Sequence, residues 1–217
     1  MDKNLLKRRR ERDKKMSRFE LDWVFVGDGS EADVAYRHAQ QNPQEKIIVI
    51  EPQHLNYSLL PNMQHWGGDI IQWLEHYPSD SVGNVRCDFA FSDITLRVIS
   101  QDPTQMYQGH AEIFKRIQQR VFNPQSREKI PNLQKNSRKY VGLVRQVLKP
   151  EGRFAFTESS LANMQGVEII TDVLRYHAFE VSVERLSEEQ VLNYESHQAK
   201  CDLQEGYPIY RITGIKK

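Results

Sequence analysis

The sequence predicts an α/β fold, a doubly wound and mostly parallel sheet, from three observations. The apolar run Trp23–Val26 ends in Gly27-Asp28-Gly29 and opens into a helix-like pattern, as do the first strand, turn and helix of such folds. A second apolar run, Ile47–Ile50, ends in Glu51, 22 residues after Gly29. Along the rest of the chain, predicted strands and helices are separated by turn residues.

The first turn and the end of the second strand together indicate a binding site. Glycines let the chain turn sharply and approach a ligand closely. Ser30 is expected to cap the following helix, with Asp33 in a capping-box-like position. A carboxylate at Glu51 can accept both hydroxyls of a ribose, so the pair suggests an adenosine-containing cofactor. The alternative is a purely structural turn, because two glycines alone are weak evidence.

Length and composition indicate a single globular domain. The chain has 217 residues, of which 39% are hydrophobic and 27% charged, enough to bury a substantial core. No apolar run approaches the roughly 18 residues of a membrane span, and the basic N-terminus lacks the apolar core of a signal peptide. We therefore expect a cytoplasmic protein without a membrane partner. The two cysteines are isolated and the seven histidines show no metal-ligand spacing, so no metal is expected.

The net charge of +1 hides a strong asymmetry. Residues 1–18 hold nine Lys/Arg against three Asp/Glu, and residues 115–139 hold eight against one, whereas residues 19–114 hold four against fourteen. Basic segments on an acidic body are typical of a protein that binds a polyanion such as RNA. The alternative is that both are merely solvated stretches.

The predicted organisation is a basic N-terminal arm at 1–18 and one domain at 19–217 with a basic insert at about 101–138. Within the domain we expect, in order, a strand at 22–27, a helix at 31–41, a strand at 46–51, a short helix at 54–60, a weak strand at 63–66, a helix at 70–76, a strand at 85–91, helices at 108–121 and 139–148, a strand at 154–157, a helix at 161–176, and β-rich segments at 180–185 and 207–216.

Several short motifs follow one another in a recognisable order. They are Gly27-Asp28-Gly29 with Glu51, Asn62 through Gly68-Asp69 with Pro78-Ser79-Asp80-Ser81-Val82, Phe91-Ser92-Asp93-Ile94-Thr95, Leu148-Lys149-Pro150-Glu151-Gly152-Arg153-Phe154 ending in Thr157-Glu158, and Tyr194-Glu195 followed by Glu205-Gly206-Tyr207-Pro208-Ile209-Tyr210-Arg211. Over about residues 22–215 this order resembles the class I S-adenosylmethionine-dependent methyltransferases, and most of all the bacterial tRNA (guanine-N7) methyltransferases. The resemblance implies a Rossmann-like methyltransferase sheet with an antiparallel C-terminal strand, S-adenosyl-L-methionine as cofactor, and tRNA or another structured RNA as partner.

The resemblance also implies two groups of site residues. The cofactor-binding group is Gly27, Asp28, Gly29, Glu51, Pro52, Gly68 and Asp69, with Asp69 facing the adenine end. The substrate-binding group is Asp93, Thr157, Glu158, Tyr194 and Glu195. Four of these carboxylates have a structural alternative, since Asp69, Asp93 and Glu158 could cap helices and Glu195 could be a surface residue.

The chemistry explains why carboxylates would be retained. Guanine N7 carries an unshared electron pair, so methyl transfer needs no general base, and orientation of the reactants supplies much of the rate. Carboxylates can accept from N1–H and the exocyclic amino group of guanine. Asp93, at the carboxyl end of the fourth predicted strand, is the candidate catalytic residue, with Glu158 and Glu195 supporting it.

The sequence also departs from the family pattern. Glu31 replaces the third glycine of the cofactor turn, and the prolines and tryptophan that flank the family's aspartate are absent around Asp93. A catalytically impaired RNA-binding relative therefore remains an alternative. A nicotinamide-dependent oxidoreductase is a second one, because Gly27-x-Gly29-x-x-Ala32 with Glu51 loosely fits a dinucleotide fingerprint.

Overall fold

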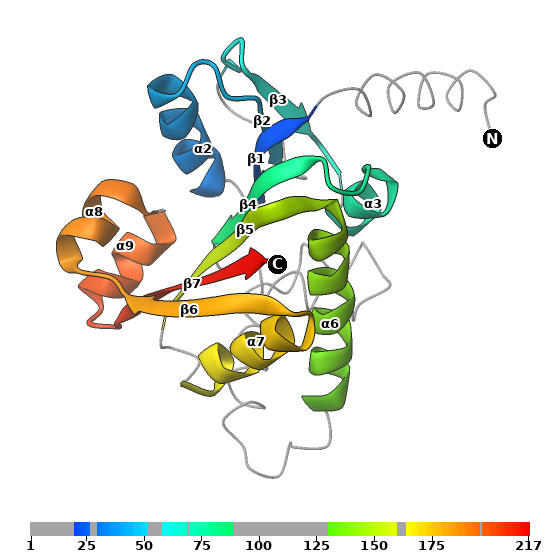
Figure 1. Cartoon of the computed structure of the whole chain (residues 1–217). Coiled ribbons are helices and arrows are strands. Elements are labelled where there is room, and N and C mark those ends of the chain that lie inside the picture. The colour runs from blue at the N-terminus through cyan, green and yellow to red at the C-terminus, as the bar shows by residue number, and fades with distance from the viewer. Residues whose placement is uncertain are drawn as a thin grey trace.

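The computed structural model describes residues 20–26, 30–51, 58–68, 70–88, 130–159, 164–195 and 197–217. Within these ranges seven strands form one sheet in the order β3-β2-β1-β4-β5-β7-β6, with helices over both faces (Figure 1). The expected doubly wound sheet is therefore confirmed.

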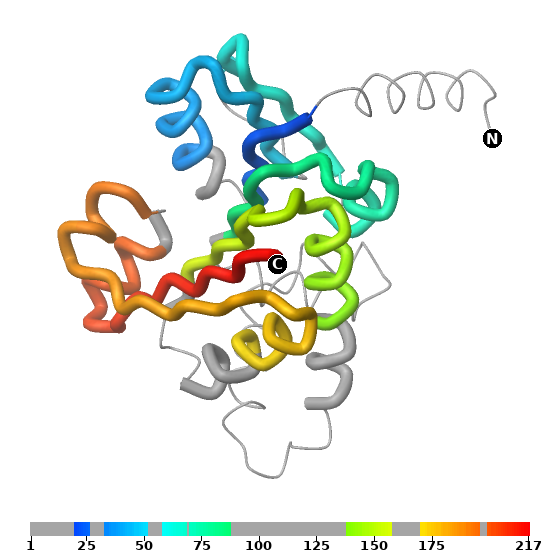
Figure 2. Tube along the Cα trace, viewed as in Figure 1, coloured from blue at the N-terminus to red at the C-terminus, as the bar shows by residue number. Residues whose placement is uncertain are grey.

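The first five strands run parallel to one another, and the last two add two antiparallel strand pairings. The strands are β1 (Leu21–Val26), β2 (Ile47–Ile50), β3 (Met63–Trp66), β4 (Val82–Asp88), β5 (Leu148–Ser159), β6 (Phe179–Arg185) and β7 (Ile209–Lys216). β7 runs antiparallel to both β5 and β6, which confirms the expected antiparallel C-terminal strand. Figure 2 shows β7, the red end of the trace, lying between them.

One face of the sheet is covered by α2 and by a pair of short helices. α2 (Ser30–Gln41) packs Val34 and Ala35 against Phe25 of β1 and Val49 of β2. Farther along the same face, α8 (Glu188–Tyr194) and α9 (His197–Gln204) form a separate small core with Ile209 of β7. Because side chains alternate along a strand, Phe25 and Arg86, which pair in the β1–β4 register, share this face.

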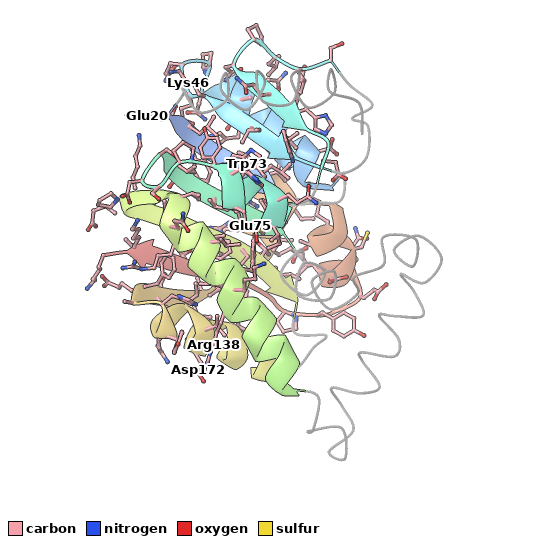
Figure 3. The ribbon with its side chains drawn as sticks, turned by 90° about the vertical axis from the view of Figure 1, so that its right-hand side faces the viewer. Glu20, Lys46, Trp73, Glu75, Arg138 and Asp172 are labelled. Carbon is pink, nitrogen blue, oxygen red and sulfur yellow. The ribbon has the colours of Figure 1, made fainter. Side chains whose placement is uncertain are left out.

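The opposite face is covered by α3 (Ile70–His76), α6 (Ile130–Val147) and α7 (Met164–Tyr176). Figure 3 looks onto this side, with Trp73 and Glu75 on α3 and Arg138 on α6. Trp73 is buried in the larger core, Lys139 of α6 pairs with Glu75 at 2.9 Å, and the Arg138 guanidinium lies 4.2 Å from the centre of the Tyr176 ring. These contacts fasten α6 to both of its helical neighbours.

Asn62, part of the motif that resembles the methyltransferases, has a structural role. Its side-chain amide donates to the backbone oxygens of Ala39, Asn42 and Glu45 at 3.2, 3.1 and 3.1 Å. The last carbonyls of a helix lack partners within the helix. Asn62 therefore caps the end of α2 and fixes the turn that leads into β2.

Several expected boundaries were wrong. α6 begins at Ile130 rather than at 139, because Pro131 lies in the first turn, where its missing N–H costs nothing. β5 begins at Leu148 rather than at 154, and its pairing with β4 is irregular between Val82 and Asn84.

Two further expectations also need correction. The sequence prediction lacked α8 and α9, although Ser187 and Gln190 form a complete capping box at the start of α8. Ser30 is the first residue of α2, so it belongs to the helix instead of preceding it as the predicted cap. The predicted arm at 1–18, the helix at 108–121 and the insert up to residue 129 lie outside the described residues. No helix in the described ranges is long and apolar enough to cross a membrane.

Candidate active site

The strand order reverses between β1 and β4, and this reversal defines the candidate site. β1 pairs with β2 on one side and with β4 on the other, so that Val26 lies beside both Ile50 and Cys87. In open α/β sheets, ligands bind outside the carboxyl ends of the strands at such a point. The predicted cofactor turn directly follows Val26.

Glu51 lies at this edge, one residue beyond the end of β2. It is 2% exposed. Its backbone N–H donates to the carbonyl of Trp66 at 3.1 Å, and its own carbonyl is 2.8 Å from Nε2 of His65. β3 therefore fixes the backbone of Glu51 next to the switch point, where a carboxylate suits ribose hydroxyls.

Gly68 lies at the same edge, just past β3, and packs under an indole. A Cβ added at Gly68 would lie 2.7 Å from Nε1 of Trp66, which is closer than two such atoms can approach. At Gly67 the nearest atom to an added Cβ is Cε1 of His65, at an ordinary 3.5 Å. Position 68 therefore needs glycine for the Trp66 ring to keep its place.

On the other side of the switch point, Thr157 and Glu195 come together. Thr157 pairs with Asp88 of β4 and with Arg211 of β7 in the sheet register. Its hydroxyl, which is buried, donates to Oε2 of Glu195 at 2.9 Å. The structure thus joins two predicted substrate residues that are far apart in sequence.

Glu195 is the centre of a buried charge network. Its side chain is 0% exposed, so the alternative of a surface carboxylate is wrong. Arg86 of β4 donates to Oε2 at 2.6 Å, and Arg211 of β7 donates to Oε1 at 2.5 Å. Arg211 also lies 3.8 Å from Glu184. Both oxygens of the Glu195 carboxylate therefore have protein donors.

A third arginine reaches the same place from α2. Arg37 donates through Nη1 to the carbonyl of Asn193 at 2.7 Å and through Nη2 to the carbonyl of Glu195 at 3.2 Å. These carbonyls belong to the C-terminal end of α8, where a cation is favourable. Arg37 thereby links α2, which follows the predicted cofactor turn, to the helix that ends at Tyr194.

Tyr194 differs from its neighbour Glu195 in exposure. It is the last residue of α8 and is 60% exposed. An exposed aromatic ring beside a fixed backbone can stack on a nucleotide base.

Glu158, the predicted substrate residue that follows Thr157, lies opposite Tyr210 in the register between β5 and β7.

The other predicted site residues lie outside the described residues. They are Gly27, Asp28, Gly29, Pro52, Asp69 and Asp93. Within the described ranges, no group of His, Cys, Asp and Glu side chains could hold a metal ion.

Sequence reasoning missed the three arginines of the network. Arg211 ends the motif Tyr207-Pro208-Ile209-Tyr210-Arg211, so the motif contained one of them without a role. Arg86 interrupts the apolar pattern of β4, and an arginine inside a central strand is a signal for a buried partner. Arg37 gives no comparable signal, since arginine is common on helix surfaces.

Comparison with known proteins shows the fold. No family model and no curated protein matches the sequence. The 16S rRNA methyltransferase KamB superposes with a TM-score of 0.54 at 12% identity, over 96% of this chain and 93% of that one. A 16S rRNA (adenine(1408)-N(1))-methyltransferase variant from Catenulisporales acidiphilia, solved with its cosubstrate SAM, gives 0.52 at 13% identity, over 95% and 90%. The chain therefore has the Rossmann-like methyltransferase fold.

Proposed function

We propose that this protein is an S-adenosylmethionine-dependent methyltransferase that acts on RNA, with guanine N7 of tRNA as the acceptor. The proposal of S-adenosylmethionine as methyl donor rests on the position of Glu51. Its buried carboxylate lies at the carboxyl end of β2, beside the β1–β4 switch point. In doubly wound folds this position accepts hydrogen bonds from a ribose.

The described residues at this edge fit an adenosyl group. Glu51 supplies the acceptor for ribose hydroxyls, and Gly68, a member of the predicted cofactor set, lets the Trp66 ring pack directly against the backbone after β3. Gly27, Asp28, Gly29, Pro52 and Asp69 complete the proposed set. When bound, S-adenosylmethionine supplies an electrophilic methyl group. The chain's own residues hold and orient it.

RNA as the acceptor is supported by charge and by the comparisons. The segments 1–18 and 115–139 are strongly basic, and phosphate contacts supply much of the affinity for nucleic acid. Two solved structures that superpose with TM-scores above 0.5 are, by their names, rRNA methyltransferases. Tyr194, exposed at the end of α8, would stack on the target base.

Guanine rather than adenine is favoured by the predicted acidic residues. Asp93 and Glu158 would accept from N1–H and the amino group of guanine, whereas the N1 edge of adenine offers no N1–H. Since N7 is already nucleophilic, the residues need only align the base with the methyl group. Thr157 and Glu195 would act behind them by holding the end of α8 against the sheet.

The decisive test measures donor binding and product on the same preparation. Calorimetry with S-adenosylmethionine should show binding that Glu51→Ala weakens, and NAD should not bind. Incubation with unmodified tRNA, followed by nucleoside mass spectrometry, should yield 7-methylguanosine. An rRNA fragment serves as the competing acceptor. Detection of methyladenosine instead of 7-methylguanosine would show that the acceptor base is adenine and not guanine.

Asp93→Ala should abolish methyl transfer and leave donor binding within a fewfold. If donor binding were lost in parallel, Asp93 would belong to the donor half of the site. A chain that binds RNA but never the donor would be the non-catalytic relative that Glu31 in the cofactor turn suggests.

A further inference from the structure

The C-terminal end of α8 is held from two directions. From the sheet side, the carboxylate of Glu195, the C-cap residue of α8, receives hydrogen bonds from β4, β5 and β7. From the α2 side, Arg37 donates to the carbonyls of Asn193 and Glu195. The two carbonyls that Arg37 binds flank Tyr194. The backbone of this exposed tyrosine is thus fixed immediately before and after it.

The chemistry of the network indicates positioning rather than stability. A buried ion pair often contributes no more to stability than an apolar group of the same size. Here two arginines and a threonine converge on one carboxylate with 0% exposure. What such a network does provide is a defined geometry, because an arginine fork binds oxygen atoms only in fixed directions.

Because Arg37 belongs to α2, it links the end of α8 to the part of the site where the methyl donor is proposed to bind. α2 begins at Ser30, directly after the predicted cofactor turn. Arg37 lies two helical turns farther along α2 and spans 156 residues of sequence to reach Asn193. One side chain therefore connects the helix that follows the predicted cofactor turn to the two residues that flank Tyr194, which would contact the acceptor base.

We propose that Arg37 and Glu195 are positioning residues, which together hold Tyr194 as a rigid platform for the acceptor base at a fixed place relative to the donor. The proposal rests on the proposed function for the identity of the base. The fixing of α8 itself does not depend on catalysis.

The test uses the full chain and compares Arg37→Gln with Arg37→Lys and Arg175→Gln. Arg175 lies on α7 with its side chain 65% exposed and 3.9 Å from the Asp172 carboxylate. Arg175→Gln therefore removes one positive charge, as Arg37→Gln does, but far from α8 in the sequence. Hydrogen–deuterium exchange of the peptides covering α8 and α9 reports the fixing directly. Arg37→Gln should speed exchange in α8 about tenfold, Arg37→Lys less, and Arg175→Gln not at all.

A double-mutant cycle tests whether Arg37 acts through Tyr194. RNA affinity or KM is measured for Arg37→Gln, Tyr194→Ala and the double variant, with Tyr194→Phe as the control that keeps an aromatic ring. Arg37→Gln alone should weaken RNA binding about tenfold and leave donor affinity unchanged. In the Tyr194→Ala background the same change should have little further effect, because the platform is already gone.

Unchanged exchange of α8 in Arg37→Gln would overturn the proposal, as would full additivity in the cycle. Failure of the proposed function has a different signature, because it would abolish donor binding and methylation in the wild-type chain. The exchange experiment would still decide whether Arg37 fixes α8.

Discussion

Thr157 and Glu195 lie 38 residues apart in sequence and share a hydrogen bond of 2.9 Å in the buried part of the sheet. Thr157→Val keeps the shape of the side chain but removes the donor. Because hydrogen bonds to charged groups contribute about 1.5–3 kcal/mol, the free energy of unfolding should fall by about that amount. Urea denaturation measures it, and Thr157→Ser should recover most of the loss. Equal stability of Thr157→Val and wild type would contradict the bond.

Removing the charge of Glu195 should be far more damaging. Glu195→Gln removes the negative charge of the buried carboxylate to which Arg86 and Arg211 both donate, and breaking a buried ion pair from one side costs about 3–5 kcal/mol. Glu184→Gln is the matched control, because Glu184 is 53% exposed and 3.8 Å from the same Arg211. Its effect should stay below about 1 kcal/mol. Similar losses in the two variants would mean that burial does not set the energy of the network.

Aspartate should not be able to replace Asn62. Asn62→Ala removes a donor shared by three carbonyls and should cost about 1–3 kcal/mol of unfolding free energy. Asn62→Asp should be at least as destabilising, since carboxylate oxygens cannot donate to carbonyl oxygens and would repel them. Thermal denaturation of both variants checks the order. A stable Asn62→Asp protein would refute the capping role.

Gly68 and Gly67 form a natural pair for testing the Trp66 contact. Gly68→Ala places a methyl group 2.7 Å from Nε1 of Trp66, whereas Gly67→Ala meets its nearest neighbour at 3.5 Å. Overpacking of this kind costs about 1–3 kcal/mol, so only Gly68→Ala should lose stability. Adding Trp66→Phe should relieve the clash by removing Nε1. If the indole borders the donor, Gly68→Ala should also weaken S-adenosylmethionine binding in calorimetry.

His177 should make stability depend on pH. Burial lowers the pKa of His177 below 6.5, a backbone hydrogen bond with Arg138 opposes this, and the charges of Arg145 and Arg138 lower it further. Because the folded state binds the proton less readily, the unfolded state takes up more protons as the pH falls through 6.5. Stability should therefore be full above pH 6.5 and decline below it.

The measurement is urea denaturation of wild type and His177→Gln on both sides of pH 6.5. The decline should be smaller in the variant, which has no imidazole to protonate. An identical decline in both proteins would assign the pH dependence to other groups.

Local patterns predicted much of the fold, and contacts between distant segments explain what they missed. β3 and α3 match their predicted ranges, 63–66 and 70–76, because Gly67-Gly68 separates a short alternating run from a helical one. α8 and α9 have 7 and 8 residues, too few for a helical period to stand out. Apart from the capping box at the start of α8, they are stabilised by packing on β7.

The same distinction applies to the site. Glu51 could be placed from sequence because its position follows from one strand and its end. The partners of Glu195 come from β4, β5 and β7, which become neighbours only through the strand order. No spacing along the chain encodes that order, so sequence motifs indicated Glu195 and Thr157 but gave no role to the arginines that bind Glu195.

The place of β7 in the sheet has a consequence for synthesis of the protein. Among the described strands β7 comes last in sequence, yet it lies between β5 and β6 and pairs with both. While the ribosome is still making residues 209–216, β6 has no neighbour and the carboxylate of Glu195 lacks Arg211. The first five strands can assemble on the nascent chain, but β6 and the carboxylate of Glu195 gain these partners only after β7 has been made.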